Sequence, residues 1–178
     1  MFSATLLPRF ALLALSLVAF GACHVTPYQR ALPEWLQKVY VPMVSNQTYE
    51  PGLEEIITKS LQAEILSDGR LDVVQKSKAD AVVQVNLLDF EETTSDFESD
   101  NIASRKQMSV QTEIKVFDPR DMDNPIGSVA PFKIALGYRS DYRSSSAELD
   151  VDARARLGET AALQILRALM SQIQMKNP

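Results

Sequence analysis

The hydrophobic residues of this chain recur with two periods, one typical of helices and one of strands. Between residues 53 and 65 an apolar residue recurs at every fourth position, and Ile56 widens the stripe, so the segment is predicted to form an amphipathic helix. The repeating residues are Leu53, Ile57, Leu61 and Ile65. Pro51 falls where a first helical turn accepts proline, and Asp68-Gly69 is typical of a helix end.

A second helix is predicted before the C-terminus. Ser145 and Glu148 have the spacing of a capping box, which marks a helix start. One helical face is then expected to carry Val151, Ala155, Ala162, Ile165, Leu166, Leu169 and Ile173.

Strands are predicted where apolar and polar residues alternate. Residues 81–90 and 108–117 have one dry and one wet side, as in a sheet with a single covered face. The dry sides are Ala81, Val83, Val85 and Leu87, then Met108, Val110, Ile114 and Val116, and in the next strand Phe132, Ile134, Leu136 and Tyr138. Residues 38–44 and 70–75 are predicted to be shorter strands, with Pro42 indicating an edge or a bulge.

The order strand, helix, strands, helix predicts an α+β fold in which two helices pack on one face of a four- to five-stranded mixed sheet. The acidic connection 91–107 is expected to be a protruding hairpin or a mobile loop, and 118–127 is dense in turn residues. The acidic run from Asp89 to Asp100 is expected to be solvated, with weak divalent-cation binding as the alternative.

The N-terminus has the pattern of a targeting segment. Arg9 precedes an apolar run of residues 10–20, which is too short to span a bilayer. The sequence Phe20-Gly21-Ala22-Cys23 resembles a bacterial lipobox, in which the cysteine receives the lipid; an ordinary cleaved signal, ending at Ala19-Phe20-Gly21, is the alternative. Since Cys23 is the sole cysteine, it cannot form an internal disulfide, and a lipid anchor explains its place.

These patterns divide the chain into a signal peptide (1–22), a short tether (23–37) and one domain (38–178). The residue after Cys23 is not aspartate, so sorting to the outer membrane is expected. The tether can reach at most about 45 Å, which keeps the domain near its membrane.

Composition excludes several classes of function. The 178 residues include 18 basic and 23 acidic side chains, which does not favour a nucleic-acid-binding surface. The sole histidine, His24, lies beside the proposed anchor, and the six glycines form no phosphate-binding loop. No catalytic residue, metal site or cofactor is therefore predicted, and the chain is not expected to be an enzyme.

An ordered set of short motifs resembles the lipopolysaccharide-assembly lipoprotein family, LptE. The motifs are Val41-Pro42, Asn46-Gln47-Thr48, Pro51-Gly52-Leu53, Asp68-Gly69-Arg70, Ala79-Asp80 and the segment from Tyr138 to Tyr142. The similarity covers roughly residues 38–174, nearly the whole predicted domain.

The resemblance implies a protein that plugs and helps assemble the outer-membrane barrel LptD and that binds lipopolysaccharide. A polar sheet face with Gln111, Glu113, Lys115 and Lys133 suits the polar lumen of a wide barrel, although such a face also suits water. Basic residues bind lipopolysaccharide in the family, and by location the candidates here are Arg105, Lys106 and Lys133.

Two other functions fit a lipoprotein of this fold. An activator of peptidoglycan synthases would generally need a long disordered tether, which the short segment 23–37 does not supply. A curli-secretion-type pore subunit would need longer amphipathic pore strands, for which 81–117 is the only candidate hairpin.

Overall fold

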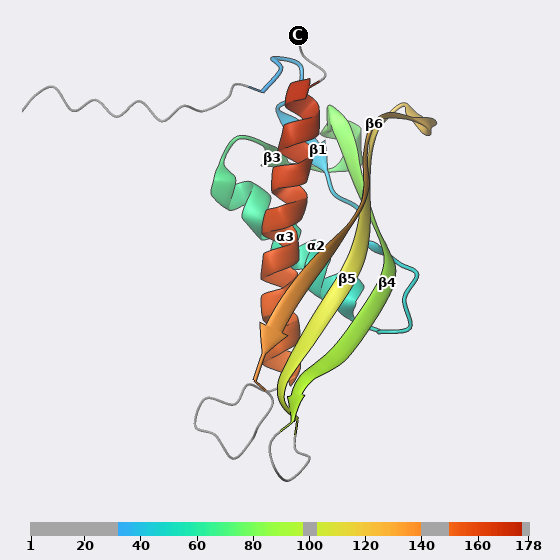
Figure 1. Cartoon of the computed structure of the whole chain (residues 1–178). Coiled ribbons are helices and arrows are strands. Elements are labelled where there is room, and N and C mark those ends of the chain that lie inside the picture. Colours follow the sequence, from blue (N-terminus) through green and yellow to red (C-terminus); the bar gives the residue numbers. More distant parts are fainter. Residues whose placement is uncertain (1–31, 98–102, 140–149, 176–178) are drawn as a thin grey trace, which may run out of the picture. The chain divides into compact units, whose positions relative to one another are not determined.

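The computed structural model describes residues 32–97, 103–139 and 150–175, which lie in one compact unit, Leu32–Pro178. Figure 1 shows two helices on one side of a long, twisted sheet. The elements in chain order are β1 (Lys38–Tyr40), β2 (Ser45–Asn46), α2 (Leu53–Asp68), β3 (Asp72–Val73), the short 3-10 helix η1 (Lys76–Lys78), β4 (Ala81–Phe97), β5 (Ala103–Asp118), β6 (Asp121–Tyr138) and α3 (Asp150–Met175). The predicted α+β class, with its order of strand, helix, strands and helix, is confirmed.

The sheet is mixed, with strand order β3-β1-β4-β5-β6. β1 pairs in parallel with both β3 and β4, whereas β4, β5 and β6 form an antiparallel meander. The prediction of one strand over 38–44 is only partly right, because β1 ends at Tyr40 and β2, which also pairs with β4, begins at Ser45. Pro42 lies in the gap, since proline has no N–H to donate to a ladder. β1 is also an interior strand and not an edge.

The β4–β5 hairpin is longer than the alternation predicts. Pairing runs from Val82 opposite Phe117 to Phe97 opposite Ala103, so most of the predicted connection 91–107 is strand. β6 begins at Asp121, so most of the turn-rich segment 118–127 is strand as well. The prediction of a protruding hairpin is thus correct, while its strands extend well beyond their apolar parts.

The core lies between the helices and one face of the sheet. The four α2 residues predicted to be buried, Leu53, Ile57, Leu61 and Ile65, are at most 1% exposed. All four predicted dry positions of β4 and all four of β5 are buried in the same cluster, where Ile134 and Tyr138 of β6 join them. Phe132 and Leu136 are half-buried against it.

The predicted face of α3 is partly wrong. Val151 is 66% exposed and Ala155 is also exposed, whereas Ala153, Leu157 and Ala161 are buried with Ile165 and Leu169. The buried stripe includes the small residues Ala153, Gly158 and Ala161, and α3 packs against both α2 and β6. Ser145 and Glu148, the predicted capping box, lie outside the described residues.

Glycines in the left-handed conformation border α2 at both ends. Gly52 (φ 90°) is the N-cap, so Pro51 precedes the helix and does not form its first turn. Gly69 (φ 71°) ends the helix, and its N–H donates to the Ile65 carbonyl (3.3 Å).

The compact unit begins before β1. Leu36 is 1% exposed in the core, although the sequence places it in the tether. The compact unit runs from Leu32 to Pro178, so a chain that starts at residue 24 contains all of it. Among the described helices none is long and apolar enough to cross a membrane.

Candidate functional site

The face of the sheet that α2 and α3 do not cover is mostly polar, apart from the buried pair Val82 and Phe117 at one end. Residues directly opposite each other in an antiparallel ladder point to the same side, so the register of β4, β5 and β6 defines this surface. We call it the open face, and its described polar residues are Gln84, Asn86, Asp89, Glu91, Thr93, Arg105, Gln107, Ser109, Gln111, Glu113, Lys115, Ser128 and Lys133. The predicted alternation of one dry and one wet face is confirmed.

Neighbouring side chains of the open face bind one another around Asn86. The Asn86 amide donates to the Glu113 carboxylate across the strands (3.0 Å) and accepts from the Gln84 amide (3.3 Å). The ammonium of Lys115 lies 2.9 Å from the same carboxylate. Its hydrogen bond is the main cause that holds the pKa of Glu113 below its ordinary value, and the hydrogen bond from Asn86 is the second. Asn86 is only 6% exposed, so this part of the face is preorganised.

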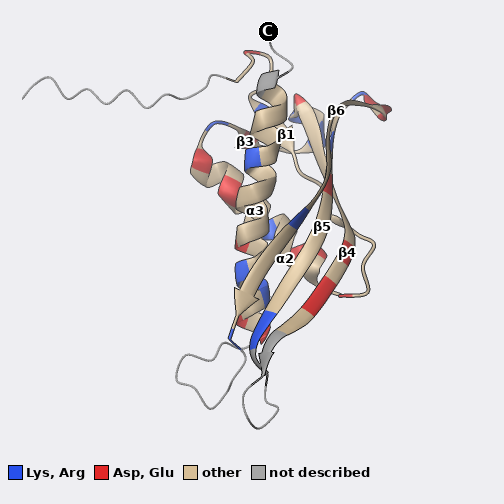
Figure 2. Ribbon diagram, viewed as in Figure 1, with Lys and Arg blue, Asp and Glu red and all other residues tan. Residues whose placement is uncertain are grey.

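Nearer the end of the hairpin, charges on the open face are accessible. The ammonium of Lys133 lies 2.6 Å from the Glu91 carboxylate, and both side chains are more than half exposed. An exposed ion pair of this kind contributes at most about 1 kcal/mol to stability, so a ligand can separate it at little cost. Figure 2 shows acidic segments of β4 beside basic segments of β5 in this region.

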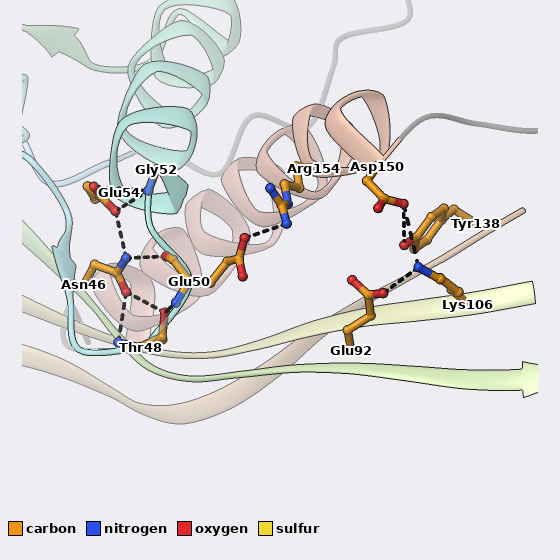
Figure 3. A network of polar contacts seen from close by, with 10 residues as sticks. All are labelled: Asn46, Thr48, Glu50, Gly52, Glu54, Glu92, Lys106, Tyr138, Asp150 and Arg154. Carbon is orange, nitrogen blue, oxygen red and sulfur yellow. Dashed lines mark hydrogen bonds and ion pairs between the residues drawn. The ribbon is translucent and has the colours of Figure 1, made fainter. Parts of the chain in front are cut away.

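Lys106 lies on the opposite side of the sheet. Its ammonium is 2.9 Å from the Glu92 carboxylate, 3.9 Å from Asp150 at the start of α3 and 5.9 Å from the centre of the Tyr138 ring. The Tyr138 hydroxyl donates to Asp150 (3.0 Å), so the four side chains join β4, β5, β6 and α3 (Figure 3). The hydrogen bond to Glu92 raises the pKa of Lys106. The pKa of Tyr138 is raised to about 12, mainly by burial and next by the hydrogen bond to Asp150.

The three predicted lipopolysaccharide contacts therefore do not form one site. Arg105 and Lys133 share the open face, but Lys133 is opposite Gln111, six residues along β5 from Arg105. That spacing corresponds to roughly 20 Å at about 3.4 Å per residue. Lys106 faces the helices, where it pairs with Glu92. The sequence pattern predicts residue 106 to lie in the connection 91–107, so it assigns Lys106 to neither face of the sheet.

Sequence reasoning also missed a second polar cluster, at the turn before α2 (Figure 3). The Asn46 carbonyl oxygen accepts from the Thr48 N–H (3.0 Å) and hydroxyl (2.7 Å), while its amide donates to the Glu50 carbonyl (2.8 Å) and to Glu54 (2.7 Å). Arg154 of α3 lies 2.6 Å from the Glu50 carboxylate. The Asn-x-Thr motif signalled the turn, but its link to α3 depends on tertiary packing.

Cys23, the predicted lipidation site, lies outside the described residues. Within the described ranges no group of three or more His, Cys, Asp or Glu side chains could hold a metal ion. Of the acidic run, Asp89, Glu91, Glu92 and Asp96 lie within strand β4.

Comparison with known proteins shows which family the chain resembles. The family model described as lipopolysaccharide-assembly, LptE, matches residues 36–174. No curated protein sequence is significantly similar to the chain.

Solved structures share the fold at low sequence identity. A Xanthomonas campestris protein of the family DUF330 is 14% identical, with a TM-score of 0.51, over 83% of this chain and 90% of that one. An uncharacterized lipoprotein B from Nitrosomonas europaea is 16% identical, with a TM-score of 0.50, over 83% and 91%. The rare lipoprotein B from Shewanella oneidensis is 16% identical, with a TM-score of 0.45, over 76% and 95%.

Proposed function

The chain belongs to the lipopolysaccharide-assembly family LptE, and on that basis we propose that it is an outer-membrane lipoprotein that plugs the LptD barrel, assists its assembly and binds lipopolysaccharide. The observation that carries the proposal is the family match over residues 36–174, which spans nearly all of the compact unit.

The open face supports the plug role. The lumen of a wide outer-membrane barrel is polar, and the open face offers a broad polar surface on three long strands. Its network around Asn86 is already satisfied internally, so placing this face against a polar wall requires little rearrangement. An interface of this kind commonly exceeds roughly 2,000 Å² and would survive detergent extraction.

Arg105 and Lys133 are the better candidates for lipopolysaccharide contact. Both are exposed on the open face, and Lys133 can exchange its pairing with Glu91 for a phosphate group of the ligand. Lys106 is 23% exposed and already held by Glu92, so in this proposal it contributes indirectly, by holding the end of the hairpin against α3.

The proposed anchor is a lipid on Cys23, after removal of residues 1–22. Two or more acyl chains give stable membrane attachment, which would hold the domain at the outer membrane. A Cys23→Ser chain is expected to lose acyl labelling and to remain unprocessed by lipoprotein signal peptidase. Normal labelling of that variant would contradict the anchor.

Affinity purification of the full chain from detergent-solubilised membranes, followed by mass spectrometry, tests the partner. A stable complex with a large outer-membrane barrel is expected, and depletion of the chain should lower barrel and surface lipopolysaccharide together. Recovery of a murein synthase without a barrel would support the activator function instead, and recovery of about nine copies of the chain itself would support a secretion pore.

Ligand binding needs a matched control. Lys133→Glu is expected to weaken lipopolysaccharide binding while sparing the barrel complex. Lys59→Glu is the control, because Lys59 on α2 forms an equally short exposed ion pair with Glu55 (2.6 Å) but lies away from the open face. Equal losses in the two variants would indicate nonspecific attraction to an anionic ligand.

A further inference from the structure

One end of the domain carries an apolar cavity that the proposed function does not use. Its volume is about 250 Å³, and it lies between residues 33–36, the paired ends of β5 and β6, and the last turns of α3. The segment before β1 lies beside this end of α3 (Figure 1). The lining is mainly apolar and includes Pro33, Leu36, Ile126, Val129 and Ile173.

Trp35 links this cavity to a second, polar hollow. The side chain lines both, and it is 55% exposed although it is the only tryptophan of the chain. The hollow has a volume of about 600 Å³ and contains two cationic side chains, Lys76 and Arg120, and two carboxylates, Asp80 and Asp118. An apolar cavity and a hollow of mixed charge thus meet at one exposed indole.

The two carboxylates of the hollow already accept hydrogen bonds from backbone N–H groups, whereas its two cationic groups are available to bind a ligand. Asp80 accepts from the N–H groups of Gln37 (3.1 Å) and Lys38 (2.8 Å), each through the same oxygen, and one Asp118 oxygen accepts from the Arg120 N–H (2.9 Å). Within the described ranges no hydrogen bond or ion pair involves the side-chain nitrogens of Lys76 or Arg120. The hollow can therefore meet a ligand that carries both a phosphate and an ammonium group.

The size of the cavity and the net charge of the chain limit which ligand can bind. At about 250 Å³ the apolar cavity is smaller than most small-molecule sites, which measure roughly 300–1,000 Å³, so it can take at most part of one hydrocarbon chain and not a multi-chain lipid. The chain has a formal net charge of −5, which disfavours contact with a strongly anionic surface. A zwitterionic headgroup with a primary ammonium, whose N–H groups can donate to the two carboxylates as a quaternary ammonium cannot, matches the mixed charge of the hollow.

The position of the chain before the domain argues for a membrane as the source. Eight residues, 24–31, separate Cys23, which carries the proposed lipid, from Leu32, a reach of at most about 30 Å, and Trp35 follows three residues later. Indole rings favour the membrane–water interface, where one edge is apolar and the other is hydrated. In this respect the inference rests on the proposed anchor.

We propose that this end of the domain docks on the phosphatidylethanolamine surface of a bilayer, with Trp35 at the interface. One acyl chain enters the apolar cavity, the lipid phosphate binds Lys76 and Arg120, and the ammonium group faces Asp80 and Asp118. The contact orients the domain on its membrane in addition to tethering it.

The test uses residues 24–178, which lack the cysteine but contain the whole compact unit Leu32–Pro178. The chain is mixed with vesicles of phosphatidylcholine alone, with half phosphatidylethanolamine, or with half phosphatidylglycerol, and binding is measured by flotation. Because Trp35 is the sole tryptophan, its emission reports the contact directly. We expect tightest binding to the phosphatidylethanolamine vesicles, emission shifted to shorter wavelength and quenching by lipids brominated in the acyl chain.

Single substitutions test whether Trp35, Lys76 and Arg120 make the contact with the vesicle. Trp35→Ser is expected to weaken partitioning about tenfold, whereas Tyr49→Ser, which removes an even more exposed aromatic ring elsewhere, should leave it unchanged. Lys76→Glu and Arg120→Glu should remove the preference for phosphatidylethanolamine, and Lys59→Glu should not. Circular dichroism melting confirms that each variant is folded.

The remaining outcomes would overturn the proposal. These are no vesicle binding, binding without a change in Trp35 emission, equal or tighter binding to phosphatidylglycerol, and an emission shift that depends on protein concentration without lipid, which would indicate a second copy in the groove. None of them requires LptD, so failure here is distinguishable from failure of the barrel pull-down.

Discussion

Gly158 of α3 lies so close to Ile56 of α2 that a Cβ atom on residue 158 would come within 2.5 Å of the Ile56 Cγ2 atom. The same Cβ would lie 3.1 Å from the Ser60 hydroxyl oxygen. The Ile56 methyl cannot easily swing away, because a β-branched side chain on a helix has one strongly preferred rotamer. The two helices therefore approach at a point that only glycine permits.

Gly158→Ala is expected to lower the free energy of unfolding by about 1–2 kcal/mol, because overpacking outweighs the better helix propensity of alanine. In an Ile56→Ala background the same change should instead raise stability, by up to about 1 kcal/mol. Urea denaturation of the two single variants and the double variant measures the coupling. Additive effects would show that the contact is not limiting.

Thr112 places a polar hydroxyl group in the apolar core. The residue is fully buried on the helix-covered face, opposite Leu87 and Phe132, and its hydroxyl oxygen has no hydrogen-bond partner among the described residues. Thr112→Val keeps the shape and removes the unpaired group, so it should stabilise the protein by about 1 kcal/mol. Thermal melting checks this, and a lower melting temperature would mean that the hydroxyl is satisfied.

Substitution of Lys106 is expected to lower the stability of the fold, whereas substitution of Lys133 is expected to leave it nearly unchanged. Lys106→Met removes the ammonium held by Glu92, Asp150 and Tyr138, so the free energy of unfolding should fall by about 1–2 kcal/mol. Lys133→Met removes only an exposed pair and should change it by less than about 0.5 kcal/mol. Urea titrations of both variants provide the comparison, and equal losses would contradict the assigned roles.

The Asn46 turn should be sensitive to loss of a single side chain. Asn46→Ala removes four hydrogen bonds of the link between β2 and α2, so a loss of about 2–3 kcal/mol is expected. Asn124→Ala is the control, because the Asn124 side chain bonds only with Asp121 at the exposed start of β6, and its loss should cost less than about 1 kcal/mol. The measurement is equilibrium unfolding in urea, and similar losses would show that the link is dispensable.

The Asp68–Arg70 pair predicts an acid-dependent contribution. Arg70 holds the pKa of Asp68 below its ordinary value of 3.8, so the unfolded chain takes up the proton first as pH falls. The stabilisation is therefore complete above that ordinary value and is lost as the pH drops through the lower, folded value. Arg70→Gln should cost about 0.5–1 kcal/mol at neutral pH, and its difference from the parent should shrink below about pH 4. A constant difference in unfolding free energy across that range would exclude the pair as the cause.

Much of the fold follows from the sequence by itself. The period of Leu53, Ile57, Leu61 and Ile65 determined the buried face of α2, and alternation determined the dry and wet sides of the long strands, because both periods come from local backbone geometry. The ordered motifs likewise identified the family that the match over 36–174 shows. These features require no knowledge of which segments meet.

Tertiary structure decided the rest. Polar residues 91–97 became strand because β5 offers a partner ladder, and Val151 and Ala155 face water because α2 and β6 contact another stripe of α3. Lys106 and Lys133 have the same chemistry, yet register places one beside Glu92 and Asp150 under the helices and the other on the open face. Local periodicity can indicate the face of a strand residue, but it cannot report which elements meet or which carboxylate each lysine pairs with, because these depend on partners that are distant in the chain.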